Sequence, residues 1–380
     1  MKVTFFTNFI NHHQVPVADE FYKLLGNDYT FVATIPMPKE FIDNGYPDFS
    51  DKPYLLKAYD NNTNFQKALE LGLSSDVVII GSASDNFIKK RLELNKLTFK
   101  YSERFFKNKF RVRAWYYLFK NHTIYRNKNL YMLCASAFTP NDASKIFAYP
   151  NKCYKWGYFT TVNKIDIDEV ISKKQHQKLN IIWVSRFISW KHPEMIIQLA
   201  KQLRFKEYEF HIEMIGDGNL KEMIQNEIVK YNLEDYITLT GSLPNNQVMK
   251  KMQDSNVFLF TSDRNEGWGA VLNEAMSSGC AVVASNEIGS APFLIENKTN
   301  GLIFKSKDNI SLFNQVEKLI RDRDYCNELA KNAYLTMYEI WSPENAANNF
   351  IHLTKSLLSN SKITIQEGPC SKAYPIKNKE

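Results

Sequence analysis

Residues 257–285, VFLFTSDRNEGWGAVLNEAMSSGCAVVAS, decide how the second half of this chain folds. They begin with an apolar run, Val257 to Thr261, that fits a buried parallel strand. A polar loop with two glycines follows at Arg264 to Gly269. A helix-forming run over residues 270–278 then precedes a second apolar strand, Ala281 to Ala284. Strand, glycine loop, helix and strand form the unit that points a helix N-terminus at an anion.

The same alternation of strands and helices runs along most of the 380 residues, which are more than one core usually serves. It predicts an α/β fold with two Rossmann-like parallel sheets, each covered by helices on both faces. The expected domains are residues 1–165 and 166–341, with the charged stretch from Asn163 to Lys178 as the linker. A last helix is expected over residues 342–360. The polar residues 361–380 are expected to form a flexible tail.

The composition indicates a soluble globular protein. Hydrophobic residues make up 44% and charged residues 23%, which is ordinary for a soluble globular protein. No apolar run reaches the ~18 residues of a membrane span. The first residues lead into a strand and lack a cleavage site, so we expect no signal peptide. The five cysteines are scattered, are odd in number and lack metal-ligand spacing, which indicates reduced thiols and a cytoplasmic protein.

Positive charge is concentrated in one segment. Residues 89–128 contain 13 Lys or Arg and 2 Glu, a net +11 in a chain of net charge +7. We expect a long basic helical region over residues 87–120. Its basic face is either simply solvated, with the aromatic residues in the core, or it attracts an anionic surface such as a membrane or a lipid-phosphate acceptor. No known nucleic-acid-binding motif accompanies the charge, so no nucleic-acid partner is expected.

Two loops of the second half carry residues suited to phosphate. Arg186 and Lys191 lie in SRFISWKHPE, between a predicted strand and a helix. An Arg fork and a Lys point charge together suit a diphosphate, although such a pair is more often a solvated loop. Gly216 and Gly218 flank Asp217 after the next strand, but the third glycine of a dinucleotide fingerprint is absent. A tight turn with a helix cap explains that loop equally well.

Glu266 and Glu274 lie on either side of the predicted helix start. Eight helical residues rise at most ~12 Å, about the reach of a nucleotide sugar from ribose to hexose. One carboxylate could hold the ribose and the other the sugar, with backbone N–H groups near Gly267 and Gly269 on the phosphate between them. Alternatively, Glu266 is a partner of the helix dipole and Glu274 a surface residue.

The motifs NEGWGAVLNEAMSSGCAVVAS, VSRFISWKHPEMIIQLAKQL and IGDGNLKEMIQNEIVKYNLEDYITLTG resemble the retaining glycosyltransferases of family 4. That resemblance covers almost the whole second half. It implies the GT-B fold, two Rossmann-like domains facing a central cleft, with the last helix crossing back to the first domain. The segments NHHQVPVADEFYKLLG, KYSERFFK and CASAFTPND in the first half resemble a bacterial subgroup that makes capsule, O-antigen and other surface polysaccharides.

The resemblance implies a role for each matching residue. Arg186 and Lys191 would neutralise the departing diphosphate, so that no metal and no cofactor is required. Glu266 would face the donor sugar and Glu274 the ribose. Phosphate would contact the backbone from Trp268 to Ala270. The donor would be a UDP- or GDP-sugar and the acceptor a glycan, expected to be lipid-linked, at the inner face of the plasma membrane.

The first half departs from the family pattern. Its first loop, NFINHHQ, lacks the Gly-Gly pair of many members. His12, His13 and Asp85 are candidates for the sugar or acceptor side, with structural histidines as the alternative for the first two. Two further functions stay open, namely a sugar-nucleotide 2-epimerase of the same fold and a non-catalytic sugar-binding subunit of a polysaccharide assembly complex. The order Arg186, Lys191, Glu266, Glu274 disfavours the epimerase.

Overall fold

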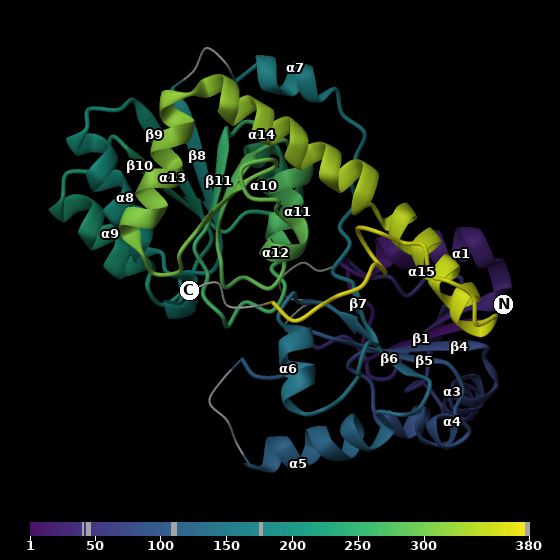
Figure 1. Ribbon diagram of the computed structural model, residues 1–380. Helices are drawn as coiled ribbons and strands as arrows, with labels where there is room; N and C mark the ends of the chain where they lie inside the picture. The colour runs from purple at the N-terminus through teal and green to yellow at the C-terminus, as the bar shows by residue number, and fades with distance from the viewer. Residues whose placement is uncertain (40–41, 43–46, 108–111, 175–177, 377–380) are drawn as a thin grey trace. The chain divides into compact units, whose positions relative to one another are not determined.

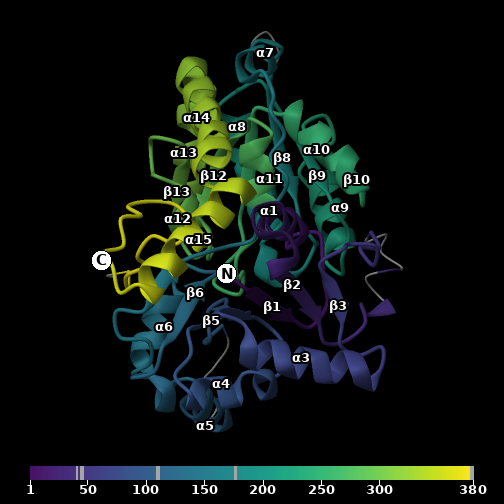
Figure 2. The ribbon, with the colours of Figure 1, turned by 90° about the vertical axis from the view of Figure 1, so that its right-hand side faces the viewer.

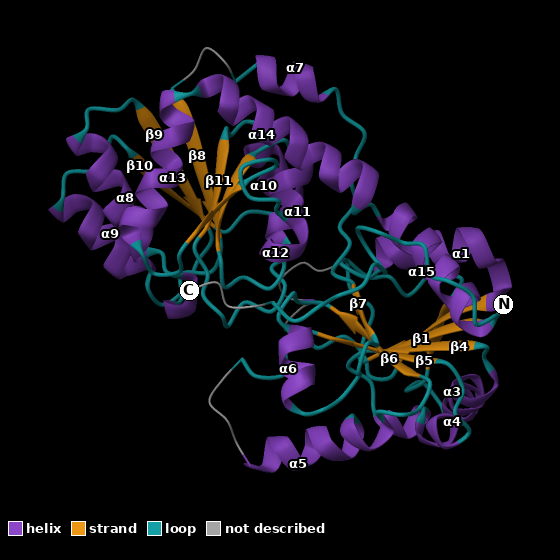
Figure 3. Ribbon diagram, viewed as in Figure 1, coloured by secondary structure: helices purple, strands orange, loops and turns teal. Residues whose placement is uncertain are grey.

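The computed structural model describes residues 1–39, 42, 47–107, 112–174 and 178–376. The chain forms two compact units, Met1–Thr161 together with Trp341–Glu380, and Val162–Ile340. Each unit has one parallel sheet with helices on both faces, as Figure 3 shows. This is the predicted fold class.

The first unit contains a seven-stranded sheet of order β3-β2-β1-β4-β5-β6-β7. Its strands are β1 (Val3–Thr7), β2 (Tyr29–Ala33), β3 (Leu55–Lys57), β4 (Val77–Ile80), β5 (Thr98–Ser102), β6 (Leu130–Cys134) and β7 (Cys153–Lys155). Its helices are α1 (Val15–Leu25), α3 (Asn62–Ser74), α4 (Lys89–Glu93), α5 (Val112–Asn121), α6 (Thr139–Lys145) and α15 (Pro343–Leu358), with 3-10 turns η1 (Gly26–Asp28), η2 (Asp85–Phe87) and η3 (Thr123–Tyr125). Every residue of β1 and β4 is buried, as expected of strands covered on both faces.

The C-terminal helix α15 returns to the first unit, as predicted. It packs on α1, and both helices cover one face of the sheet while α3 and α4 cover the other (Figures 1 and 2). The ring of Phe350 lies 5.4 Å from that of Phe21 and 5.1 Å from that of Phe99. Because Phe350 is fully buried, these aromatic contacts attach the end of the chain to this sheet.

Two expectations for this unit are wrong. The region from 87 to 120 is not one long helix, because β5 runs through it and pairs with β4 and β6. Thr98 and Phe99, β-branched and aromatic, are fully buried in this strand. The tail is not frayed over residues 368–376. Lys372 forms an antiparallel β-bridge with Tyr154 of β7, and the side chain of Cys370 is buried.

The second unit contains a six-stranded sheet of order β10-β9-β8-β11-β12-β13. Its strands are β8 (Leu179–Val184), β9 (Phe210–Ile215), β10 (Ile237–Gly241), β11 (Val257–Phe260), β12 (Ala281–Ser285) and β13 (Leu302–Phe304). Its helices are α7 (Ile167–Ser172), α8 (Glu194–Phe205), α9 (Lys221–Lys230), α10 (Asn245–Gln253), α11 (Val271–Ser277), α12 (Ala291–Leu294), α13 (Asn309–Arg321) and α14 (Arg323–Leu335), with the 3-10 turn η4 (Ser189–Lys191) and the π-helical turn η5 (Thr336–Ile340). Helices α8, α9 and α13 pack on one side of the sheet and α10, α11 and α14 on the other (Figure 1).

The expected linker is partly structured. Within it, α7 buries Ile167 and Ile171 in the core of the second unit, and Asp166 caps its N-terminus. No helix in the described part of the chain is long and apolar enough to cross a membrane. All five cysteines lie in that part and are buried and unpaired.

Candidate active site

The strand order of the second sheet predicts where a ligand would bind, at the carboxyl ends of two neighbouring strands. Strands β9 and β10 lie on one side of β8, and β11, β12 and β13 lie on the other. The direction of winding therefore reverses between β8 and β11, and the loops after these strands diverge at their carboxyl ends. Open α/β sheets bind ligands in the crevice at this switch point. The loop after β8 carries Arg186 and Lys191, and the loop after β11 carries Glu266.

Lys191 and Glu266 form a buried ion pair between these two loops. The Lys191 ammonium donates to a Glu266 carboxylate oxygen, and each side chain is only 11% exposed. The same ammonium lies 4.3 Å from the centroid of the Trp190 ring. A buried pair loses hydration on both partners, so neither charge is readily left alone. The charges of Lys191 and Glu266 therefore neutralise each other at this site.

Three hydrogen bonds fix the backbone around the pair. Thr261 donates its hydroxyl to the carbonyl of Lys191 at 2.6 Å, and the indole N–H of Trp183 donates to Thr261 Oγ1 at 2.9 Å. The backbone N–H of Asp263 donates to the carbonyl of Trp190 at 3.0 Å. These hydrogen bonds therefore join β8 and η4 to the segment that follows β11, next to Lys191.

His192 adds a side-chain link between the same loops. It has a left-handed backbone, with φ 52°, and its ring nitrogens lie 2.7 Å from Glu194 Oε1 and 3.2 Å from Asp263 Oδ2. The hydrogen bond to Glu194, with a smaller contribution from Asp263, raises the pKa of His192 despite its partial burial. Asp263 also binds Lys307 at 3.0 Å, and its carbonyl accepts the N–H of Glu266 at 3.0 Å. His192 and Asp263 thus hold the segment that bears Glu266 against the segment that bears Lys191.

Arg186 is exposed, and the Gly216–Gly218 turn supports its loop. A side chain at Gly216 would place its Cβ 2.0 Å from the carbonyl oxygen of Ser185, and one at Gly218 would lie 2.5 Å from that of Phe187. The N–H of Phe187 donates to the carbonyl of Asp217 at 2.9 Å. The two glycines therefore allow backbone to pack on backbone, which orients the loop of Arg186.

The segment from Gly267 to Ala270 connects Glu266 to α11. The Trp268 side chain is fully buried, and its indole N–H donates to Asn273 Oδ1 at 2.9 Å. Gly269 has φ 84°, and a Cβ there would lie 2.5 Å from the Phe260 ring. The side chain of Trp268 thus belongs to the core.

Glu274 lies in the first turn of α11 and is partly buried. Its Oε1 accepts a hydrogen bond from Asn245 Nδ2 at 3.1 Å. Burial raises the pKa of Glu274 to about 7, against the opposing effect of the Asn245 hydrogen bond. A carboxyl group that desolvation disfavours as an anion is suited to accept hydrogen bonds from incoming hydroxyl groups.

The first unit has a similar switch point, between β1 and β4. His12 and His13 follow β1, with ring centroids 3.7 Å apart, and His13 stacks on Tyr158 at 5.6 Å. Burial lowers the pKa of both histidines, and that of His13 falls to about 3 with a further contribution from His12. Asp85 follows β4 and forms an ion pair of 2.6 Å with Lys100. This edge is therefore aromatic and nearly neutral.

Sequence reasoning missed Glu103 and Tyr158, which reach the same edge. The Tyr158 hydroxyl donates to Glu103 Oε1 at 2.7 Å, and Glu103 also pairs with Lys107. Glu103 directly follows β5, a strand that lies where the sequence predicts a helix. The alternating residues Thr98 to Ser102 were the signal that could have revealed it.

The basic segment exposes aromatic side chains. On α5, Tyr116, Tyr117 and Phe119 are 69%, 61% and 47% exposed, whereas Leu118 is buried. The expectation that the aromatic residues of this segment lie in the core therefore holds for β5 and fails for α5. Among the described residues, no group of three or more His, Cys, Asp or Glu could hold a metal ion.

Comparison with known families agrees with this fold. Residues 164–336 match the family model of glycosyl transferases group 1. The match covers nearly the whole second unit, which therefore resembles a glycosyltransferase domain of that group. The matched residues include both switch-point loops, α11 and the Gly216–Gly218 turn.

Two of the similar curated proteins are named as glycosyltransferases that act in polymer synthesis or on a polymer. The amylovoran biosynthesis glycosyltransferase AmsK of Erwinia amylovora is 30% identical over 138 residues, 35% of this chain and 34% of that protein. The poly(ribitol-phosphate) alpha-N-acetylglucosaminyltransferase of Staphylococcus aureus is 26% identical over 199 residues, 52% of this chain and 39% of that protein. Matches to the first curated relatives span 33% to 56% of their length.

A solved structure extends the likeness to nearly the whole chain. The HepE protein of Anabaena, in complex with UDP, has a TM-score of 0.67 at 14% identity and covers 94% of this chain and 100% of its own. At this identity the likeness concerns the fold. The chain thus has the GT-B fold and resembles glycosyltransferases of surface-polysaccharide synthesis.

Proposed function

We propose that this protein is a retaining glycosyltransferase that moves a sugar from a UDP- or GDP-sugar to a lipid-linked glycan acceptor. The observation that carries the proposal is the buried pair of Lys191 and Glu266 at the switch point, beside the exposed guanidinium of Arg186. The match of residues 164–336 to glycosyl transferases group 1 supports it.

The donor's diphosphate is assigned to Lys191 and Arg186. Glu266 neutralises Lys191 and orients its ammonium. A diphosphate carries more negative charge than one carboxylate and competes for that ammonium. Glu266 is then released to the sugar ring. Preorganised cations stabilise the charge that develops on the leaving diphosphate, so no metal ion is needed for this step.

The remaining donor contacts follow from the same loops. Glu274 takes the ribose hydroxyls, and the backbone from Gly267 to Ala270 takes phosphate oxygens. As the bond from anomeric carbon to phosphate breaks, the sugar gains oxocarbenium character, which Glu266 stabilises. The departing phosphate oxygen accepts the acceptor's proton, so that attack occurs on the same face and configuration is retained.

The acceptor is assigned to the carboxyl edge of the first sheet, with His12, His13 and Asp85 as its contacts. Their pKa values keep both histidines neutral at physiological pH. Neutral imidazoles accept and donate hydrogen bonds to hydroxyl groups without attracting anions. AmsK, whose name places it in amylovoran biosynthesis, supports a glycan acceptor.

The protein is assigned to the cytoplasm, at the inner face of the plasma membrane. Exposed Tyr116, Tyr117 and Phe119 on α5 combine with the net +11 of residues 89–128. Aromatic rings insert at the headgroup level and basic residues attract anionic lipid. Flotation with anionic vesicles at low and high salt tests this assignment, and retention of binding by a Tyr116→Ser/Tyr117→Ser/Phe119→Ser variant would contradict it.

The function itself is tested in two steps. Thermal shift with UDP-, GDP- and ADP-sugars identifies the donor, and transfer is then measured with membrane-extracted acceptors. Conversion of the donor without acceptor would identify an epimerase instead. Donor binding without turnover on any extract would identify a non-catalytic subunit, and inversion at the anomeric carbon would refute the retaining mechanism.

A further inference from the structure

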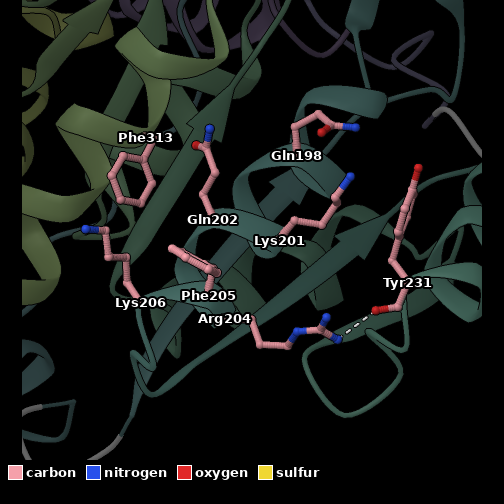
Figure 4. A pocket seen from close by; sticks show the side chains of 8 residues that line it. All are labelled: Gln198, Lys201, Gln202, Arg204, Phe205, Lys206, Tyr231 and Phe313. Atoms are coloured by element: carbon pink, nitrogen blue, oxygen red, sulfur yellow. Dashed lines mark hydrogen bonds between the residues drawn. The ribbon is translucent and has the colours of Figure 1, made fainter.

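A cavity of about 650 Å³ lies on the second unit, and Figure 4 shows the side chains that line it. Its lining comes from residues 198–205 of α8 and the residue after it, from Tyr231 at the end of α9, and from Phe313 on α13. Helix α8 starts just after Lys191 and rises about 18 Å over its 12 residues. The cavity is therefore separate from the residues assigned to the donor.

Three cations border this cavity without acidic partners. Lys201, Arg204 and Lys206 line it, no lining residue is acidic, and none of the three forms an ion pair within the described part of the chain. Arg204 donates at 2.7 Å to the carbonyls of Tyr231 and Asn232, and the Lys201 ammonium lies 3.7 Å from the centroid of the Tyr231 ring. Two of the cations are thus held in place, and their charge is left for an anion.

The cavity also presents apolar and amide groups. Phe205 is 84% exposed, the largest exposed fraction of any large hydrophobic side chain among the described residues. Beside it, Gln202 Oε1 is buried and has no hydrogen-bond partner in the described chain. An aromatic ring can cover the apolar face of a sugar, an amide can bind neighbouring hydroxyl groups, and cations bind carboxylate or phosphate.

We infer that this cavity is a docking site for an acidic glycan, one whose sugars carry carboxylate or phosphodiester groups. The inference rests on the proposed transfer to a glycan, because the occupant is a distant part of the acceptor chain. A second attachment point raises the effective concentration of the acceptor at the reacting end. Long acidic acceptors therefore gain from the cavity and short ones do not.

Binding is measured by calorimetry with an oligogalacturonate, a ribitol-phosphate oligomer, a neutral dextran oligomer and inorganic phosphate. We expect at least one acidic oligomer to bind, with affinity falling at least tenfold from 50 to 500 mM salt, and neither dextran nor phosphate to bind comparably. Lys201→Glu/Lys206→Glu should weaken binding at least tenfold and Phe205→Ala threefold or more. Lys250→Glu, at an exposed lysine of α10, is the matched control and should leave it unchanged.

Transfer assays separate this inference from the proposed function. The cavity variants should raise KM for long acidic acceptors at least fivefold and leave kcat and the donor KM unchanged. Unchanged affinity and KM in variants with wild-type melting temperatures would overturn the inference, while wild-type transfer would leave the proposed function standing. Binding of phosphate as tight as that of the oligomers would overturn it too. Sedimentation showing that Phe205→Ala abolishes a dimer would instead assign this face to a second copy of the chain.

Discussion

The two units share one strand order around their switch points but differ in what they place there. After β8 and β11 the second unit has Lys191 and Glu266 in a buried ion pair, with Arg186 exposed nearby. After β1 and β4 the first unit has two neutral imidazoles, and its Asp85 is already engaged with Lys100. The same backbone can therefore serve a doubly charged diphosphate at one edge and uncharged hydroxyl groups at the other, because loops alone set the chemistry.

The largest expected effect concerns the charged edge. Lys191→Met removes the cation assigned to the leaving diphosphate, and we expect kcat to fall about 10³-fold. Glu266 is then buried without a partner, which costs about 3 kcal/mol of stability. Lys191→Met/Glu266→Gln should regain the melting temperature and remain inactive. Activity within tenfold of wild type in the folded double variant would remove the charged edge from the mechanism.

The next effect tests Glu274 through pH. Burial raises the pKa of its carboxyl group from 4.5 to about 7, so the folded state binds this proton more tightly than the unfolded state. The resulting stabilisation is complete below about pH 4.5 and is lost as the pH rises through 7. Glu274→Gln should therefore gain stability relative to wild type between pH 5 and pH 8, on the order of 2 kcal/mol.

The same variant should bind the donor about tenfold more weakly at pH 8, because an amide accepts ribose hydroxyls less well than a carboxylate. Thermal melts across pH 5–8 and calorimetry with the donor measure the two effects. A pH-independent difference in melting temperature would show that the Glu274 carboxyl group is not perturbed.

A smaller effect is expected from His192, a positioning residue that links the two charged loops. His192→Asn keeps a left-handed backbone and one hydrogen bond, and we expect kcat to fall about tenfold with the donor KM nearly unchanged. The pKa of His192 is raised, so its protonated form, which donates to both Glu194 and Asp263, is lost at alkaline pH. Wild-type kcat should therefore decline as the pH rises through that pKa, and the variant should lack this decline. The same decline of kcat at alkaline pH in wild type and in His192→Asn would limit His192 to a purely structural role.

The smallest effect concerns the neutral edge. His13→Phe keeps a ring against Tyr158, and we expect the acceptor KM to rise about threefold to tenfold while the donor KM is unchanged. Because burial lowers the pKa of His13 to about 3, the variant should leave the pH profile between 6 and 8 unaltered. A changed donor KM in His13→Phe would contradict the assignment of donor and acceptor to different sheets.

The sequence predicted the second unit more closely than the first. Continuous apolar runs such as VFLF, and loops with Arg186, Lys191 and Glu266, are local signals that can be recognised without the tertiary structure. Strands β3, β5, β7 and β13 are not predicted from the sequence, since three to five residues among polar neighbours do not establish a period. β5 lies within the basic region that the sequence predicts as helical, so its short alternating pattern does not stand out from its cationic neighbours.

Contacts between distant segments were beyond the sequence. Gly216 and Gly218 suggested a turn, but only the structure shows that they admit the carbonyls of Ser185 and Phe187. Nothing in the order of residues links His192 to Asp263, or Lys191 directly to Glu266. These pairs arise because the strand order places β8 beside β11, which is a property of the whole sheet.

The central claim is that the charged edge of the second unit holds the donor's diphosphate. Calorimetry with the nucleoside diphosphate of the preferred donor, on wild type, Lys191→Met/Glu266→Gln and His13→Phe, tests it most directly. We expect Kd to rise at least 30-fold in the double variant and to stay within twofold of wild type in His13→Phe. Equal affinity in wild type and the double variant, or loss of binding in His13→Phe, would contradict the account.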